Sequence, residues 1–329
     1  MTTNAAAETR QTPPSPAGRV DDVTTTSTRV PGPADAPAAP APGRRLLVPL
    51  AAAVTVVLWG SAFIGIRAAG FDYSPGALTL GRVLVGTLAL TVMAGLTGRL
   101  RLPRGRVLAG VAVWGVLWFG LYNLALNAAE RTLDAGTASL LVGLAPILIA
   151  VFAGLTLGEG FPARLLAGIG IAFVGVAGIA LATSGGASDG VSVALGLAAA
   201  LVYAGSTILQ KRLLPHVDAL TMTWLGCLAG TVASLPFAPA LLAELSAAST
   251  SATLSMVYLG VFPTAVAFAT WGYALTRTTA GRLGAATYAA APLAVLMSWA
   301  FLGEVPAPVA LVGGALCLTG VLVATLRLR

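Results

Sequence analysis

The sequence predicts an all-α integral membrane protein with ten transmembrane helices, arranged as two inverted five-helix repeats. Three observations lead to this fold class. The composition is too apolar for a water-soluble domain, apolar stretches of spanning length recur with short breaks, and the residue pattern of the first half returns in the second half.

Composition alone excludes most other classes of protein. Hydrophobic residues make up 57% of the 329 residues and charged residues only 9%, whereas soluble proteins carry about 25% charged residues. The net charge of +7 comes from Lys and Arg in ones and twos beside apolar runs. That pattern anchors membrane loops and does not form a phosphate-binding patch. We therefore expect the lipid bilayer as a partner, and no nucleic acid.

The chain begins with a segment of different character. Residues 1–43 are rich in Ala, Pro, Thr and Ser and have no hydrophobic period. Met1 is followed by polar residues, so the segment does not resemble a signal peptide. We expect a disordered cytoplasmic tail.

From residue 46 onward, apolar runs approach the ~20 residues that a spanning helix needs. The predicted spans are 46–66, 74–97, 107–129, 135–157, 165–184, 191–210, 219–242, 251–275, 283–303 and 306–326. The breaks between them are too short to hold a soluble domain.

The distribution of Lys and Arg predicts the orientation, because cytoplasmic loops carry the excess of both. Thirteen such residues from Arg44 onward fall on the side of the N-terminus, and two, Arg67 and Arg131, fall on the other side. Arg82 lies inside a span and counts for neither side. This bias places both termini in the cytoplasm.

Short motifs recur at offsets of 142 to 146 residues. Trp59-Gly60-Ser61 is echoed by Ala204-Gly205-Ser206, and Leu157-Gly158-Glu159 by Leu302-Gly303-Glu304. Arg131 and Pro146 are spaced like Arg277 and Pro292. The repeats are therefore 46–184 and 191–326. Because each holds an odd number of spans, the second enters the membrane upside down, as in secondary transporters that alternate access around a midplane site.

These residues resemble the drug/metabolite transporter superfamily, in particular its EamA-type bacterial members. The resemblance covers about 46–326 and is carried by the following residues: Trp59-Gly60-Ser61 with Arg67, Pro75 followed by Arg82, Pro146, Glu159, and the stretch from Tyr273-Ala274-Leu275 through Pro292 to Glu304. It implies a ten-helix exporter or exchanger of small metabolites in the bacterial inner (plasma) membrane. In that fold, spans 1, 3, 4, 6, 8 and 9 line most of the cavity, and spans 2 and 7 contribute. This sequence has Trp224 at the second-half position that matches Arg82, so the cavity is expected to be electrostatically asymmetric.

Arg82 is the formal charge that lies well inside a span, ~12 Å from the outer end at 1.5 Å per residue. An intramembrane Arg costs ~3 kcal/mol on insertion scales and normally faces the interior of the bundle. One interpretation is a docking point for a carboxylate or another acceptor of the substrate. The alternative is an Arg satisfied by helix-end carbonyls or by a rim acid such as Asp72, Glu130 or Asp134.

Pro146 and Pro292 fall near the centres of their spans. A mid-helix proline removes a hydrogen bond and frees a carbonyl, which in lipid must find a partner or face a wet cavity. Matching prolines in the two halves therefore indicate the binding region. Kinks that serve only packing are the alternative.

Polar and aromatic residues on several spans complete the predicted cavity. Asn123 and Asn127 share one face of their span, and Thr264, Phe268 and Trp271 form a stripe on another. The predicted cavity residues are Trp59, Ser61, Arg82, Asn123, Asn127, Pro146, Tyr203, Ser206, Trp271, Tyr288 and Pro292, and Tyr122 could join them. Helix–helix hydrogen bonding or packing is the alternative for each of them. Glu159 and Glu304 are interpreted as repeat-related caps rather than proton carriers.

The sequence contains no catalytic set, no metal triad and no nucleotide-binding motif, so we expect neither an enzyme nor a cofactor. His216 falls in a loop, and Cys227 and Cys317 are interpreted as small fillers. The predicted function is secondary transport of a small metabolite, such as an amino acid or a related amphiphile. A non-transporting membrane protein, either an intramembrane enzyme or a scaffold, is the alternative. Substrate identity, direction, coupling and assembly into a homodimer are left open.

Overall fold

The computed structural model describes residues 42–97, 102–157, 163–182, 187–275, 277, 286–287 and 289–325. The chain divides into two units, 1–41 and 42–329, and the described residues all belong to the second. The predicted tail thus lies almost wholly outside them, and its last residues enter the first helix, which begins at Pro42. Every regular element in the described residues is helical.

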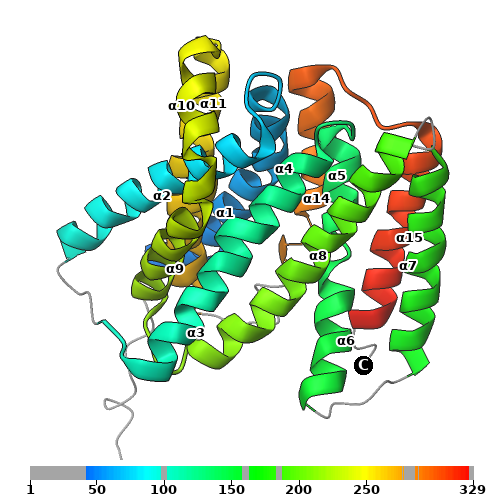
Figure 1. The fold of residues 1–329 in the computed structure, drawn as a ribbon. Coiled ribbons are helices and arrows are strands. Elements are labelled where there is room, and N and C mark those ends of the chain that lie inside the picture. Colours follow the sequence, from blue (N-terminus) through cyan, green and yellow to red (C-terminus); the bar gives the residue numbers. More distant parts are fainter. Residues whose placement is uncertain are drawn as a thin grey trace, which may run out of the picture. The chain divides into compact units, whose positions relative to one another are not determined.

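The helices form one bundle and are labelled in chain order (Figure 1). The first stretch of the chain forms α1 (Pro42–Ala69), α2 (Pro75–Thr97), α3 (Gly105–Gly115), η2 (Val116–Tyr122), α4 (Asn123–Ala129), α5 (Ala135–Val142), α6 (Ala145–Leu157) and α7 (Ala163–Ala182). The second forms α8 (Ala187–Leu213), α9 (Ala219–Ser234), η3 (Leu235–Phe237), α10 (Ala238–Ala247), α11 (Thr250–Leu259), η4 (Gly260–Val266), α12 (Ala267–Leu275), α14 (Ala290–Met297), η5 (Ser298–Leu302) and α15 (Pro308–Thr325).

Six helical stretches of the described chain are long and apolar enough to cross a membrane. They are Leu46–Ala69, Pro75–Leu96, Gly105–Ala129, Gly190–Leu213, Ala219–Ala247 and Thr250–Ala274. Shorter apolar helices occupy Ala135–Ile149, Ala163–Ile179, Ala290–Leu302 and Pro308–Val323. The predicted apolar runs are therefore helical, and four of them fall short of a full spanning length.

Polar side chains fix where several helices begin. The carboxylates of Asp134 and Asp218 accept the backbone N–H groups of Thr137 and Thr221, at 2.8 and 2.9 Å. The hydroxyl of Ser249 does the same at the start of α11. Each cap satisfies a donor that the first helical turn leaves without a partner.

Three turns of the bundle are π-helical, and two of them fall at matching places. The turn η2 lies between α3 and α4, and η4 lies between α11 and α12, 144 residues further along. Pro263 lies inside η4 and has no N–H to donate, which favours a widened turn there.

Both prolines that we placed at span centres instead lie in the first turn of a helix. Helix α5 ends at Val142, and Pro146 is the second residue of α6. Pro292 is the third residue of α14. A proline in the first turn of a helix leaves no hydrogen bond unmade, because the N–H groups there have no intrahelical partner. The chain therefore accommodates Pro146 by interrupting the span rather than by kinking it, and Pro292 by its place in the first turn of α14.

Helices from the two halves pack against each other in pairs, α2 with α9 and α7 with α15. The hydroxyls of Thr87 and Thr231 are hydrogen-bonded at 2.9 Å and are 144 residues apart. The thiols of Cys227 and Cys317 are both buried and free, as expected of fillers. Each donates across a pair, to the carbonyls of Val83 and Ala172 at 3.4 and 3.5 Å.

The matching helix starts revise one detail of the sequence comparison. Helices α2 and α9 begin at Pro75 and Ala219, which are 144 residues apart. With this offset, the position in the second half that corresponds to Arg82 is Gly226 and not Trp224. The second half carries no charge at either position.

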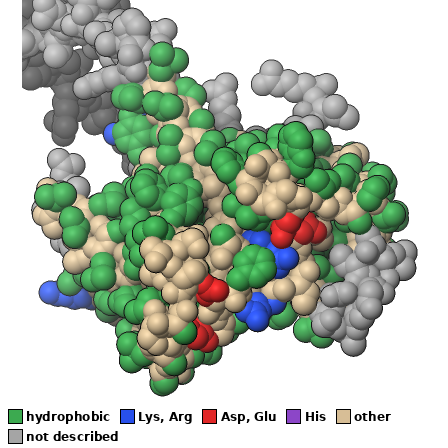
Figure 2. Space-filling model, turned by 90° about the horizontal axis from the view of Figure 1, so that it is seen from above, with side chains coloured by type: hydrophobic (Ala, Val, Ile, Leu, Met, Phe, Trp, Pro, Cys, Tyr) green, Lys and Arg blue, Asp and Glu red, His purple; other side chains and the backbone are tan. Residues whose placement is uncertain are grey.

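The outer surface of the helices is strongly apolar. Leu88, Val92, Leu96 and Phe173 are each 60% or more exposed. Exposed apolar area of this extent needs a non-aqueous environment. One end of the bundle carries the α1–α2, α4–α5, α10–α11 and η5–α15 connections, and there acidic and basic side chains gather within an apolar surround (Figure 2). We call it the polar end.

Candidate functional site

A cavity of about 100 Å³ lies among the helices of the bundle. Its lining comes from α1, α2, η2, α4, α5, α6, α8, η4, α12, α14 and α15, and from Thr287. This agrees with the lining expected from the resemblance with two exceptions: the described residues of α9 take no part, and Leu318 of α15 contributes. The volume is well below the ~300 Å³ of typical ligand pockets.

Arg82 brings the cationic group to this cavity. Its side chain lines the cavity, the residue is 6% exposed, and Nε and Nη1 have no hydrogen-bond partner among the described residues. Asp72 and Asp134 bond instead to Ser249 and Thr137. The guanidinium therefore retains donors for an acceptor that enters the cavity.

Aromatic rings surround the rest of the cavity. Trp118 lies 4.8 Å from Tyr203 and 5.8 Å from Phe268, measured between ring centroids. Trp59 packs edge-on against Phe268 at 5.5 Å, and Tyr122 lies 6.0 Å from Tyr203. These rings come from four different segments of the chain and present an apolar face beside the charge of Arg82.

The two matching π-helical turns place residues in the cavity and are stabilised by polar side chains. Asn123 donates through Nδ2 to the carbonyls of Phe119 and Trp118, at 2.8 and 3.3 Å. Thr264 donates its hydroxyl to the carbonyl of Leu259, five residues back, at 2.9 Å. A wide turn leaves carbonyls poorly paired, and these side chains supply the missing donors.

Five of the eleven predicted cavity residues do line the cavity: Trp59, Arg82, Asn123, Pro146 and Tyr203. Tyr288 lies outside the described residues. The remaining five, Ser61, Asn127, Ser206, Trp271 and Pro292, lie elsewhere.

Three of these five have contacts that account for their position. The hydroxyls of Ser61 and Tyr258 are hydrogen-bonded at 2.6 Å, which ties α1 to α11. Asn127 donates to the hydroxyl of Thr79 at 2.9 Å and so ties α4 to α2. The ring of Trp271 lies 5.1 Å from that of Trp59, tilted by 39°, and so ties α12 to α1. These residues therefore join helices, the alternative that the sequence left open.

Ser206 and Pro292 depart from the prediction in opposite ways. Ser206 is fully buried within the packing of α8, whereas Pro292 is exposed on α14. A span-level pattern does not fix which way a side chain points, and here it misplaced both.

Sequence reasoning missed several lining residues, including Phe63, Trp118, Phe119, Ser139 and Pro263. Most are apolar and lie in apolar runs, so their chemistry gave no signal. Trp118 could have been found, because it lies four residues before Tyr122 and hence on the same helical face.

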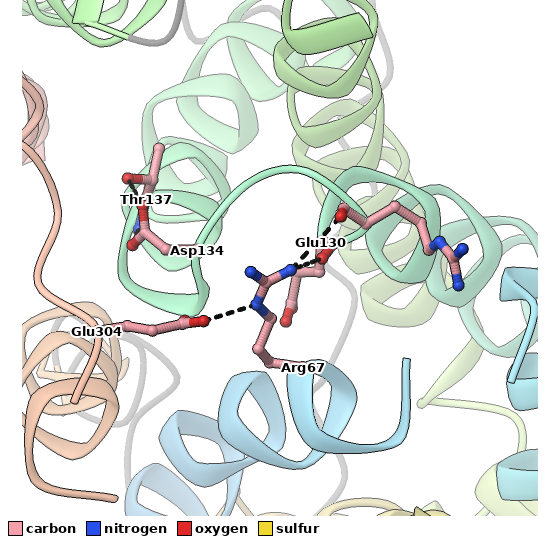
Figure 3. Close-up of polar contacts among 6 residues, drawn as sticks. Arg67, Glu130, Asp134, Thr137 and Glu304 are labelled. Carbon is pink, nitrogen blue, oxygen red and sulfur yellow. Dashed lines mark hydrogen bonds and ion pairs between the residues drawn. The ribbon is translucent and has the colours of Figure 1, made fainter. Parts of the chain in front are cut away.

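At the polar end, one ion pair joins α1 to the connection before α15. Nε of Arg67 donates to Oε1 of Glu304 at 2.8 Å, and Nη1 donates to the backbone carbonyl of Glu130 at 2.9 Å. Figure 3 shows Arg67 between Glu304 and Glu130. We call the Arg67–Glu304 pair the latch.

Glu304 is thus more than the cap that its position predicted. Gly303 adopts a left-handed φ of 66°, which ends η5. The backbone N–H of Glu304 then donates to the carbonyl of Ser298 at 3.3 Å, so the backbone does cap the helix. The side chain, however, forms the latch. Glu159 lies outside the described residues.

Further bonds tie the polar end together. Oε2 of Glu244 accepts from the backbone N–H of Ser74 at 2.8 Å, and Asp72 accepts from Ser249. Nη1 of Arg131 donates to the carbonyl of Gly70 at 2.7 Å. The connections at this end are therefore joined by side chains.

The described residues contain no group of three His, Cys, Asp or Glu that could hold a metal ion. His216 is exposed in a turn after α8, as expected of a loop residue.

Comparison with known proteins gives consistent results for the two halves. The model of the EamA-like transporter family matches the chain twice, over residues 46–181 and 190–326. A probable terminal-alkyne amino-acid exporter of Streptantibioticus cattleyicolor is 39% identical over 274 residues, which cover 83% of this chain and 92% of that protein. An uncharacterized transporter of Bacillus subtilis is 36% identical over 80% of this chain and 86% of its own length.

More distant likenesses extend over a similar length. A probable amino-acid metabolite efflux pump of Salmonella typhimurium is 25% identical over 82% of this chain and 91% of that protein. One solved crystal structure aligns with a TM-score of 0.58 at 23% identity, covering 85% of this chain and 98% of that one. This last likeness concerns the fold alone.

Proposed function

Because the chain belongs to the EamA-like transporter family, we propose that it is a secondary transporter that exports or exchanges a small metabolite such as an amino acid or a related amphiphile. The family consists of transporters, so the chain is not an enzyme. The names of two relatives, an amino-acid exporter and an amino-acid metabolite efflux pump, support this substrate class.

The observation that carries the proposal is the position of Arg82. It lines the cavity, is buried, and has two guanidinium nitrogens without a partner among the described residues. A buried charge without a partner is costly, and a substrate carboxylate would remove that cost. Rings such as Trp118 and Tyr203 would hold the apolar part of the same molecule.

The proposed mechanism is alternating access between two inverted halves, with ten membrane crossings and both termini in the cytoplasm. The matched segments, the two π-helical turns 144 residues apart and the helix pairs α2–α9 and α7–α15 support it. In this mechanism the polar end faces outward, and the cavity is accessible from one side of the membrane at a time.

The test uses a pair of substrates that differ only in the carboxylate. A radiolabelled neutral amino acid and its methyl ester are compared in proteoliposome counterflow, for wild type, Arg82→Gln and Arg82→Lys. Hydrogen bonds to a charged group are worth ~1.5–3 kcal/mol, which corresponds to roughly 10- to 150-fold. Arg82→Gln should therefore lose about that much preference for the acid over the ester. Arg82→Lys should be intermediate, because it retains the charge without the planar fork.

Lys211→Gln is the matched control, because Lys211 is an exposed cation on α8 and its loss should leave the preference unchanged. If Arg82→Gln inserts at wild-type levels and still prefers the acid to the same degree, Arg82 does not dock the carboxylate.

A further inference from the structure

Glu130 is a buried acid at the polar end, and the transport proposal assigns it no role. It follows the last residue of α4, is 3% exposed, and neither carboxyl oxygen has a hydrogen-bond partner among the described residues. Its backbone carbonyl, by contrast, accepts from Arg67. A carboxylate without partners in such a place is costly, whereas a neutral carboxyl group costs much less. Burial accordingly raises the pKa of Glu130 well above its usual range.

The charges that act on this carboxyl group come from several elements. Arg67 on α1 and Arg82 on α2 favour its ionised form, while Glu304 before α15 and Asp134 before α5 oppose it. The neighbouring Arg131 is exposed, and its guanidinium bonds to Gly70.

Other acids at the polar end already have hydrogen-bond or ion-pair partners. Asp134 accepts from the backbone N–H and the hydroxyl of Thr137, at 2.8 and 2.6 Å. Asp72 and Glu244 accept from Ser249 and Ser74. Glu304 is paired with Arg67. Glu130 thus combines deep burial with two carboxyl oxygens that lack hydrogen-bond partners in the described part of the chain.

We propose that Glu130 is a proton-binding site and that its proton controls the latch between Arg67 and Glu304. With the proton bound, the carboxyl group is neutral and Arg67 pairs with Glu304, which is the arrangement seen here. When the proton leaves to water, the new carboxylate competes with Glu304 for Arg67 and repels Glu304. The latch then loosens, and the polar end can open.

The consequence for transport rests on the proposed function. If the polar end faces outward, uptake of a proton by Glu130 closes the carrier toward the outside. Loss of the proton favours opening, so the state of this one residue would link the direction of access to pH.

Distances across the latch test the proton site without any substrate. Phe71, beside the end of α1, and Val305, next to Glu304, are 70% and 58% exposed. Both are replaced by cysteine and spin-labelled in a background with Cys227→Ala and Cys317→Ala. Pulsed electron–electron double resonance spectroscopy then measures the distance between the labels in nanodiscs from pH 5 to pH 9.

Wild type should show a single short distance at low pH and a longer population that grows as pH rises. Because one proton is released, the ratio of long to short should rise by no more than about tenfold per pH unit. Glu130→Gln and the apolar Glu130→Met should both retain the short distance at every pH. Glu304→Gln should show the longer distance throughout.

Glu244→Gln is the matched control, since it removes another acid at the same end and should preserve the wild-type pH dependence. A pH dependence in both Glu130→Gln and Glu130→Met equal to that of wild type would overturn the proposal, as would a wild-type distance that does not change with pH. These outcomes are independent of the Arg82 test, because no substrate is present. Either proposal can therefore fail alone.

Discussion

The two segments that match the family model, 46–181 and 190–326, share a backbone plan but not a charge distribution. Both contain a π-helical turn, with the same offset between them as between the starts of α2 and α9. Yet the first segment supplies Arg82 to the cavity, and the second supplies uncharged lining residues such as Tyr203, Thr264 and Phe268. At the position that corresponds to Arg82, the second segment has Gly226.

This difference indicates a division of labour within one fold. Backbone features that occur in both segments are suited to movements that both must make. Side chains that occur in one segment are suited to recognition, because a substrate carboxylate needs one cation and not two. The predictions below separate these two contributions, beginning with the contact that joins the segments.

The largest effect should come from the glycines at which the segments meet. A Cβ on Gly115 would overlap the backbone of Gly226, whereas a Cβ on Gly170 would meet nothing within 4 Å. Gly115→Leu should therefore cost more than ~3 kcal/mol through overpacking that backbone cannot relieve. Gly170→Leu should be close to neutral. The measurement is the fraction of monodisperse protein that survives heating in detergent; equal survival of the two variants would contradict close contact between α3 and α9.

The next effect compares the two π-helical turns. Asn123→Leu leaves the carbonyls of Phe119 and Trp118 without their side-chain donor, and Thr264→Val does so for Leu259 alone. An unsatisfied buried group costs ~1–3 kcal/mol, so Asn123→Leu should lower the melting temperature more than Thr264→Val. Thr319→Val is the control, because that exposed hydroxyl bonds within its own helix. A larger loss in Thr264→Val would reverse the comparison.

A smaller effect distinguishes the two prolines. Pro146 lines the cavity and Pro292 is exposed. Each lies in a first turn, so replacement by Ala should leave insertion intact. Proline fixes φ at the start of its helix, and a change of ~1 kcal/mol in the barrier to movement there alters the rate about fivefold. We expect that slowing for Pro146→Ala and little change for Pro292→Ala, measured as turnover against substrate concentration. Equal slowing in the two variants would mean that both prolines take part in the movement that limits turnover.

The smallest effect concerns Asp72 and pH. Hydrogen bonds from Ser249 lower the pKa of Asp72 below its usual range. The carboxylate therefore stabilises the fold above the ordinary pKa of ~3.9, and this contribution is lost as the pH falls through the lower, folded value. Below about pH 4, the melting temperature of wild type should fall more steeply than that of Asp72→Asn. Parallel curves would mean that this carboxylate does not couple α11 to the α1–α2 turn.

Helix positions were predictable from the sequence because a membrane requires long apolar runs, and Arg82 was predictable because a charge in such a run is rare. The break before Pro146 and the wide turns were not, since they depend on how neighbouring helices satisfy the backbone. Of the stripe predicted on this span, Thr264 and Phe268 line the cavity whereas Trp271 does not, because its ring packs against Trp59. The latch escaped prediction because Arg67 and Glu304 are far apart in the chain.

The position of Arg82 has an electrical consequence for the membrane itself. At an effective dielectric constant of about 20, a fixed positive charge raises the energy of a cation 8 Å away by roughly 2 kcal/mol. That excludes cations by about thirtyfold, as arginines do in other selective pores. If Arg82 docks a carboxylate as proposed, the same charge in the cavity would also resist the leak of protons and sodium ions. Fewer cations would then cross the membrane each time the bundle opens, and the ion gradients of the cell would be better preserved.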